Sequence, residues 1–223
     1  MITTPDYALA ASSALRVLVF NHITETPVNP SPILLNYPGV RVLPYTRMAL
    51  DAGIERHDLV PMFGNADAAT FHLDLPGMED VKYVVVYNMR LPFEIIWRAC
   101  ARELGHIVLG HTGHSRSMEA RMAEANCFSI HLICPRPVLR LLADSGVPLT
   151  MNVLANTTGC AGECIEKMQS LPGISVDPAL NRAVRDLFAP HIMEFARFYQ
   201  SSPVPDHSPV VDLCHYMDGY EEA

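Results

Sequence analysis

The chain has 223 residues, of which 49% are hydrophobic, so it is long and apolar enough to bury a sizeable core. It carries 16 basic and 24 acidic residues, and this net charge of −8 repels phosphate backbones and disfavours direct nucleic-acid binding. Asp6 and Arg16 interrupt any secretory signal, and no apolar run approaches the ~20 residues of a membrane span. We therefore expect a cytoplasmic protein with no membrane partner.

The first half of the chain predicts a helix, a linker and three strands. Apolar residues at helical spacing indicate a helix from Thr4 or Asp6 to about Asn21-His22. Residues 27–39 contain four prolines, so we expect an extended linker there. A weak helix and loop is expected over 46–63. The strands are expected at 40–45, 69–73 and 82–87, and their succession indicates a small antiparallel sheet.

The second half predicts helices. A long one runs from Pro92 to about Gly110, and another covers 117–134 and ends before Pro135. Shorter helices are expected at 138–144, 150–157, 161–170 and 178–199, followed from Ser201 by a tail that is either a surface strap or disordered. The fold class is therefore α+β.

The long helix contains Arg102-Glu103-Leu104-Gly105-His106. A zinc-protease helix carries His-Glu-x-x-His: two histidines one turn apart bind the metal, and the glutamate beside the first polarises the attacking water. Glu103 and His106 stand where the base and the second ligand belong, and Arg102 stands where the first ligand belongs. The motif is thus RELGH in place of HExxH, which leaves enzymatic activity open.

Together with the strand that ends at Tyr87-Asn88, the Gly110-His111 pair and Glu124-Ala125-Asn126-x-Phe128, this motif resembles the ImmA/IrrE family of bacterial and phage metallopeptidases. The resemblance covers roughly Tyr7 to Pro137. It implies a zincin-like core, in which a small antiparallel sheet packs on an active-site helix and on a second helix that bears a carboxylate ligand. The expected division is a metallopeptidase-like domain at 1–137, a helical region at 138–200 and an acidic tail at 201–223.

The carboxylate ligand that the resemblance implies falls on Met122. A guanidinium has no free lone pair, and a thioether is a poor match for zinc, so Arg102 and Met122 both argue against the zinc ion that the family implies. Glu119 lies one turn before Met122 and is a possible replacement ligand. Glu124 is a second one, although the spacing of two residues from Met122 points the Glu124 side chain elsewhere on the helix. The resemblance also implies a supporting role for Asn126, which orients a metal-binding histidine in the family.

His111 and His114 lie past the end of the long helix, where they are either polar surface residues or fold back toward the site. Arg102 could fill the space of the metal and pair with Glu103 or Glu119. Glu103 would then be an ion-paired helix carboxylate, and His106 either a hydrogen-bonded core residue or a surviving ligand.

Two functions follow from these alternatives. The favoured one is an impaired family member that binds a regulatory protein without cutting it. The resemblance implies that this regulatory protein is a helix-turn-helix repressor of a phage, mobile-element or stress-response switch. The other is an active zinc endopeptidase with substituted ligands, in which a zinc-bound water would attack with Glu103 as base and His106 as a ligand.

Overall fold

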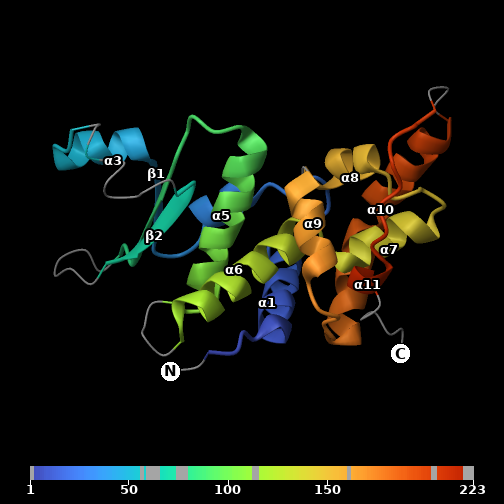
Figure 1. Ribbon diagram of the computed structural model, residues 1–223, viewed down its shortest axis with the longest axis horizontal. Helices are drawn as coiled ribbons and strands as arrows, with labels where there is room; N and C mark the ends of the chain where they lie inside the picture. Colours follow the sequence, from blue (N-terminus) through green and yellow to red (C-terminus); the bar gives the residue numbers. More distant parts are fainter. Residues whose placement is uncertain are drawn as a thin grey trace.

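The computed structural model describes residues 3–55, 58, 66–73, 80–111, 116–159, 162–201 and 205–217. Figure 1 shows a small sheet with α3 at one end of the molecule and the C-terminal helices at the other. The elements in chain order are α1 (Tyr7–Phe20), α2 (Pro30–Leu35), β1 (Val40–Pro44), α3 (Tyr45–Ala52), β2 (Ala68–His72), β3 (Tyr83–Tyr87), α5 (Phe93–Val108), α6 (Met118–Ile133), α7 (Arg136–Asp144), α8 (Met151–Thr158), α9 (Gly162–Ser170), α10 (Pro178–Ser201) and α11 (Cys214–Met217). The α+β class is confirmed.

The sheet has the strand order β1-β3-β2 and is mixed. β2 pairs with β3 antiparallel, with Thr70 opposite Val85, whereas β1 pairs with β3 parallel, with Val42 opposite the same residue. The expectation of a wholly antiparallel sheet was therefore wrong for the β1–β3 pair. Alternating apolar residues mark a strand without fixing its direction, and the chain between β1 and β3 is long enough for the crossover that a parallel pair needs.

The proline-rich stretch also differs from the expected linker, because it contains the short helix α2. Asn29 caps this helix by accepting a hydrogen bond from the Ser31 N–H, and Pro30 occupies the first helical position. Prolines are compatible with a first turn, where the backbone N–H groups have no partner within the helix. Ile33 and Leu34 then bury their side chains against the core.

Helix α5 lies between the sheet and α6, and its packing positions the site. Its inward side buries Leu104 and Ile107. Gly105 allows α6 to approach closely, because an added Cβ there would lie only 3.0 Å from Cδ1 of Phe128. Ser117 caps α6 by accepting from the Ala120 N–H. Residues 102–106 and 118–122 are thereby held on facing helices beside the edge strand β2.

The described C-terminal region packs into the same core as the rest of the chain. A single cluster of buried side chains runs from Leu15 on α1 to Phe188 on α10 and on to Tyr216 on α11. The tail is a strap where it is described: Val210 forms a β-bridge with Thr150, and the Tyr216 hydroxyl donates a 3.0 Å hydrogen bond to the Cys134 carbonyl. Among the described helices, none has both the length and the apolar character to cross a membrane.

Candidate functional site

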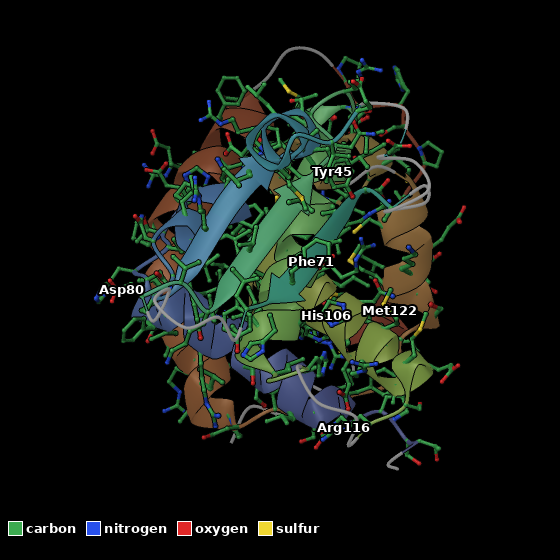
Figure 2. All side chains as sticks on the ribbon, turned by 90° about the vertical axis from the view of Figure 1, so that its left-hand side faces the viewer. Tyr45, Phe71, Asp80, His106, Arg116 and Met122 are labelled. Atoms are coloured by element: carbon green, nitrogen blue, oxygen red, sulfur yellow. The ribbon has the colours of Figure 1, made fainter. Side chains whose placement is uncertain are left out.

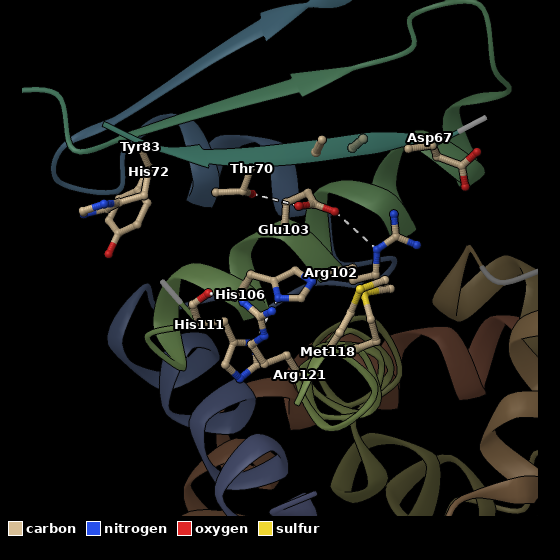
Figure 3. Close-up of a pocket in the computed structure, with 14 residues that line it drawn as sticks. Asp67, Thr70, His72, Tyr83, Arg102, Glu103, His106, His111, Met118 and Arg121 are labelled. Atoms are coloured by element: carbon tan, nitrogen blue, oxygen red, sulfur yellow. Dashed lines mark hydrogen bonds and ion pairs between the residues drawn. The ribbon is translucent and has the colours of Figure 1, made fainter. Parts of the chain in front are cut away.

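A cavity of about 630 Å³ opens between β2, α5 and α6. Figure 2 shows Phe71 on β2 and, lower in the view, His106 and Met122 on the helices. Its polar lining residues, drawn in Figure 3, are Asp67, Thr70, His72, Tyr83, Arg102, Glu103, His106, His111 and Arg121. The structure therefore brings Arg102, Glu103, His106, His111 and Met122 to one place. For the first three, this is the grouping that the motif on α5 predicts.

Glu103 sits at the wall of the cavity with both carboxylate oxygens engaged (Figure 3). Its Oε2 accepts a 2.8 Å hydrogen bond from the Thr70 hydroxyl, and its Oε1 lies 3.3 Å from Nε of Arg102. The carboxylate is 5% exposed and the Arg102 side chain 19%, so the pair is largely removed from solvent. Arg102 thus satisfies a buried carboxylate that would otherwise be costly to the fold.

Burial raises the pKa of Glu103, and the charge of Arg102 together with the hydrogen bonds from Thr70 and Arg102 opposes that rise. The same surroundings affect Tyr45 on α3. Burial, with the negative charges of Glu103 and Asp67, raises its pKa to about 12, so its hydroxyl stays a hydrogen-bond donor, here to the Ala66 carbonyl at 2.9 Å. The Glu103 carboxylate is therefore held by hydrogen bonds from Thr70 and Arg102, and Tyr45 beside it stays neutral.

The helix side carries two histidines in contact. Nδ1 of His106 lies 2.9 Å from Nδ1 of His111, and Nε2 of His111 lies 2.8 Å from Oε2 of Glu124. His111 and Glu124 side chains are each 2% exposed. Oε1 of Glu124 accepts hydrogen bonds from the Asp6 N–H at 2.7 Å and from Arg116. His111 therefore folds back onto the site, and His114 lies outside the described residues.

Burial lowers the pKa of His106 to about 3, and the charges of His111, Arg102 and Arg121 lower it further in that order. Burial also lowers the pKa of His111, although its hydrogen bond to Glu124 opposes the shift. Both imidazoles are consequently neutral near pH 7. Arg121 adds a second guanidinium to the cavity, where it donates to the His111 carbonyl at 3.3 Å while its buried Nε has no partner within the described part of the chain.

The remaining candidate ligands lie apart from the cavity centre. Glu119 is exposed in the first turn of α6, and Glu124 is buried on the side that faces His111 and Asp6. Asn126 is half-buried and hydrogen-bonds through its side chain to none of the residues that the structure describes. Met122 lines the cavity, where it offers only a thioether.

A zinc ion needs three or four nitrogen, sulfur or anionic oxygen donors around one point. Over the described ranges, no three His, Cys, Asp or Glu side chains converge in this way. The positive charges of Arg102 and Arg121 that make His106 harder to protonate also oppose a divalent cation beside it. The residues at this site therefore do not fit the zinc ion that the family implies in general.

Comparison with known proteins gives one finding. Residues 54–152, just under half of the chain, match the model of the IrrE N-terminal-like domain. This part of the chain is similar to the IrrE N-terminal-like domain. The match spans β2, β3, α5 and α6, so the cavity of the IrrE-like domain is built from matched residues, and the resemblance to the ImmA/IrrE metallopeptidases is confirmed. No curated protein and no solved structure matches the chain.

Sequence reasoning missed three residues of the IrrE-like site, Thr70, Arg116 and Arg121, and it did not predict that Glu124 is buried against His111. Thr70 sits 33 residues before its partner Glu103, on a strand whose alternation shows only that one side faces a helix. Arg121 gives a usable signal, because it precedes the predicted ligand position Met122 directly. Arg116 gives none.

Proposed function

We propose that this chain is a metallopeptidase-like protein that binds a regulatory protein at the IrrE-like cavity without cleaving it. The partner that the family resemblance suggests is a helix-turn-helix repressor. The observation that supports this most is the Arg102–Glu103 pair, in which a guanidinium stands beside the carboxylate at the position of the first metal ligand.

A general base must be free to take a proton from an attacking water. Both oxygens of Glu103 already accept hydrogen bonds, one from Thr70 and one from Arg102. Turning either oxygen toward a water would leave a buried donor unpaired, which costs roughly 1–3 kcal/mol. The local contacts therefore favour a structural carboxylate.

The cavity offers a surface that suits a protein segment. Met118, which lines it, is 68% exposed. Methionine is enriched at protein-binding surfaces, so an exposed one at the cavity suits contact with a protein. The net charge of −8 is the second support. It disfavours binding of the chain to DNA itself, which leaves a protein as the favoured partner.

A zinc endopeptidase with substituted ligands is the second candidate. One observation favours it: the ring nitrogens of His106 and His111 converge to 2.9 Å, so a second imidazole stands where a metal ligand could be recruited. The two guanidiniums of the cavity weigh against it, since they place positive charge beside that pair.

The test is to mix the purified chain with helix-turn-helix repressors from the same genome, with and without added zinc. Binding is measured by calorimetry and repressor integrity by mass spectrometry. A stable complex with an intact repressor supports the proposal. Zinc-dependent cleavage that Glu103→Gln abolishes supports the peptidase, and absence of both binding and cleavage contradicts the proposal.

A matched pair of variants locates the binding surface. Met118→Glu places a charge at the cavity rim, whereas Met193→Glu places the same charge on α10, at the opposite end of the molecule in Figure 1. We expect Met118→Glu to weaken repressor binding at least ~10-fold, as for a residue at an interface centre, and Met193→Glu to leave it unchanged. Equal loss in both variants would place the binding surface elsewhere.

A further inference from the structure

Two hydrogen bonds in series connect a buried carboxylate to His106 at the cavity. Glu124 bonds to Nε2 of His111, the other ring nitrogen of His111 bonds to Nδ1 of His106, and His106 lines the cavity. Figure 3 shows the two imidazoles one behind the other below Glu103. The two rings meet edge to face, with centroids 5.1 Å apart.

The direction of each hydrogen bond follows from its neighbour. Glu124 accepts from the Asp6 N–H and from Arg116, and a carboxylate so placed can only accept. Nε2 of His111 must therefore carry a proton and donate it to Glu124. A neutral imidazole has one N–H, so Nδ1 of His111 is the acceptor, and Nδ1 of His106 must be the donor.

The same rule then fixes the last nitrogen of the series. His106 carries its only proton on Nδ1, so its Nε2 has a lone pair. No described residue hydrogen-bonds to that nitrogen, and His106 faces the cavity. The low proton affinity of both buried imidazoles agrees with the neutral forms that this assignment requires.

The charges around the cavity limit what can meet this lone pair. Two guanidiniums, Arg102 and Arg121, are balanced by the two acids Glu103 and Asp67. A formally neutral cavity that offers both N–H donors and one strong acceptor is complementary to a neutral amide, which has one acceptor and at least one donor. An ammonium or a carboxylate would meet as many like as opposite fixed charges, so a net charge on the ligand adds no attraction.

We infer that Glu124 and His111 are positioning residues that hold His106 as its Nδ1–H tautomer, so that Nε2 accepts a hydrogen bond from an amide N–H of the bound protein. The choice of a peptide or side-chain amide as ligand rests on the proposed function. The tautomer belongs to the free protein and stands independently of any partner.

Long-range ¹H–¹⁵N correlation spectra of the free protein, with ¹⁵N-labelled histidine, measure each tautomer directly at neutral pH. We expect the Nδ1–H form for His106 and the Nε2–H form for His111. His111→Leu removes the acceptor of the His106 Nδ1–H, so His106 should shift toward the Nε2–H form. The exposed control His207→Leu should leave His106 unchanged. A wild-type His106 in the Nε2–H form would overturn the inference, even if the His111 variant failed to fold.

Small probes test the ligand class on the same spectra. N-methylacetamide carries the amide, and acetate and methylammonium carry the two charges at equal concentration. A shift of the His106 Nε2 resonance with the amide alone supports the assignment. A response to acetate or methylammonium without one to the amide contradicts it. Failure to bind a repressor would contradict the proposed function and leave these spectra unaffected, so the two failures are distinguishable.

Discussion

The Thr70 hydroxyl donates a 2.8 Å hydrogen bond to Oε2 of Glu103, and this contact joins the edge strand β2 to helix α5. It gives a hydrogen-bond donor to the carboxylate oxygen that Arg102 does not contact. The catalytic-type carboxylate is thus held between a strand and a guanidinium, which makes it part of the packing that fixes the cavity.

Thr70→Val keeps the shape of the side chain and removes the donor. We expect it to lower the free energy of unfolding by about 1–3 kcal/mol, because a buried carboxylate loses one of its hydrogen bonds. Urea denaturation measures the change. Thr70→Ser retains the hydroxyl and should recover most of the stability, and equal losses in both variants would assign the effect to packing.

Gly105→Ala tests the close approach of α5 and α6. The added Cβ would lie 3.0–3.2 Å from Cδ1, Cγ and Cβ of Phe128, and the last of these cannot move without its backbone. We expect a net loss of about 1–3 kcal/mol from overpacking, despite the better helix propensity of alanine. Gly173→Ala is the control, since nothing lies within 4 Å of its added Cβ. Thermal unfolding of both variants decides the point, and a stabilised Gly105→Ala would contradict so close an approach of the two helices.

His131 predicts how stability depends on pH. Burial, and then the charge of Arg136, lowers its pKa to about 3, against 6.5 for the ordinary side chain. Between these values the unfolded chain binds a proton that the folded chain does not, so stability falls as the pH falls below 6.5. His131→Met should reduce this loss by up to ~1.4 kcal/mol per pH unit.

The measurement is urea denaturation of wild type, His131→Met and the exposed control His207→Met from neutral pH down to about pH 5, within the titration range of histidine. The control should follow the wild type. A His131→Met variant with the full wild-type slope would show that His131 does not contribute.

Tyr216 predicts that the C-terminal strap is part of the core. Its ring is fully buried against His131 and beneath the Arg136 guanidinium, which lies 4.6 Å from the ring centroid. We expect Tyr216→Ala to cost about 3–5 kcal/mol, as for other buried aromatic truncations. Hydrogen exchange over 205–217 should rise in this variant. Val210→Ala, at a side chain 70% exposed, should change neither quantity.

Local sequence patterns predicted the parts of the site that depend on one element. The spacing of Glu103 and His106 on one helix, and the pairing of Arg102 with its neighbour Glu103, follow from residues within two turns. The contacts of Thr70 with Glu103 and of Glu124 with His111 do not, because they depend on the strand order and on how α5 and α6 pack against each other.

The fold shows the same division. β-branched and aromatic residues placed the strand Tyr83–Tyr87, yet the parallel partner Val40–Pro44 required knowledge of how the chain crosses over. The prolines of 27–39 predict a linker because proline breaks helix interiors, whereas in the helix Pro30–Leu35 a proline occupies the first position, where it removes no intrahelical hydrogen bond.

The central claim is that a guanidinium paired with Glu103 replaces the first metal ligand, so that the site does not hold zinc. Zinc content per chain, measured by atomic spectroscopy after purification and again after zinc is added and excess removed, tests it most directly. We predict substoichiometric zinc in the wild type and a stoichiometric gain in the double variant Arg102→His, Met122→Glu, which restores the missing donors. Stoichiometric zinc in the wild type that His106→Ala removes would contradict the account.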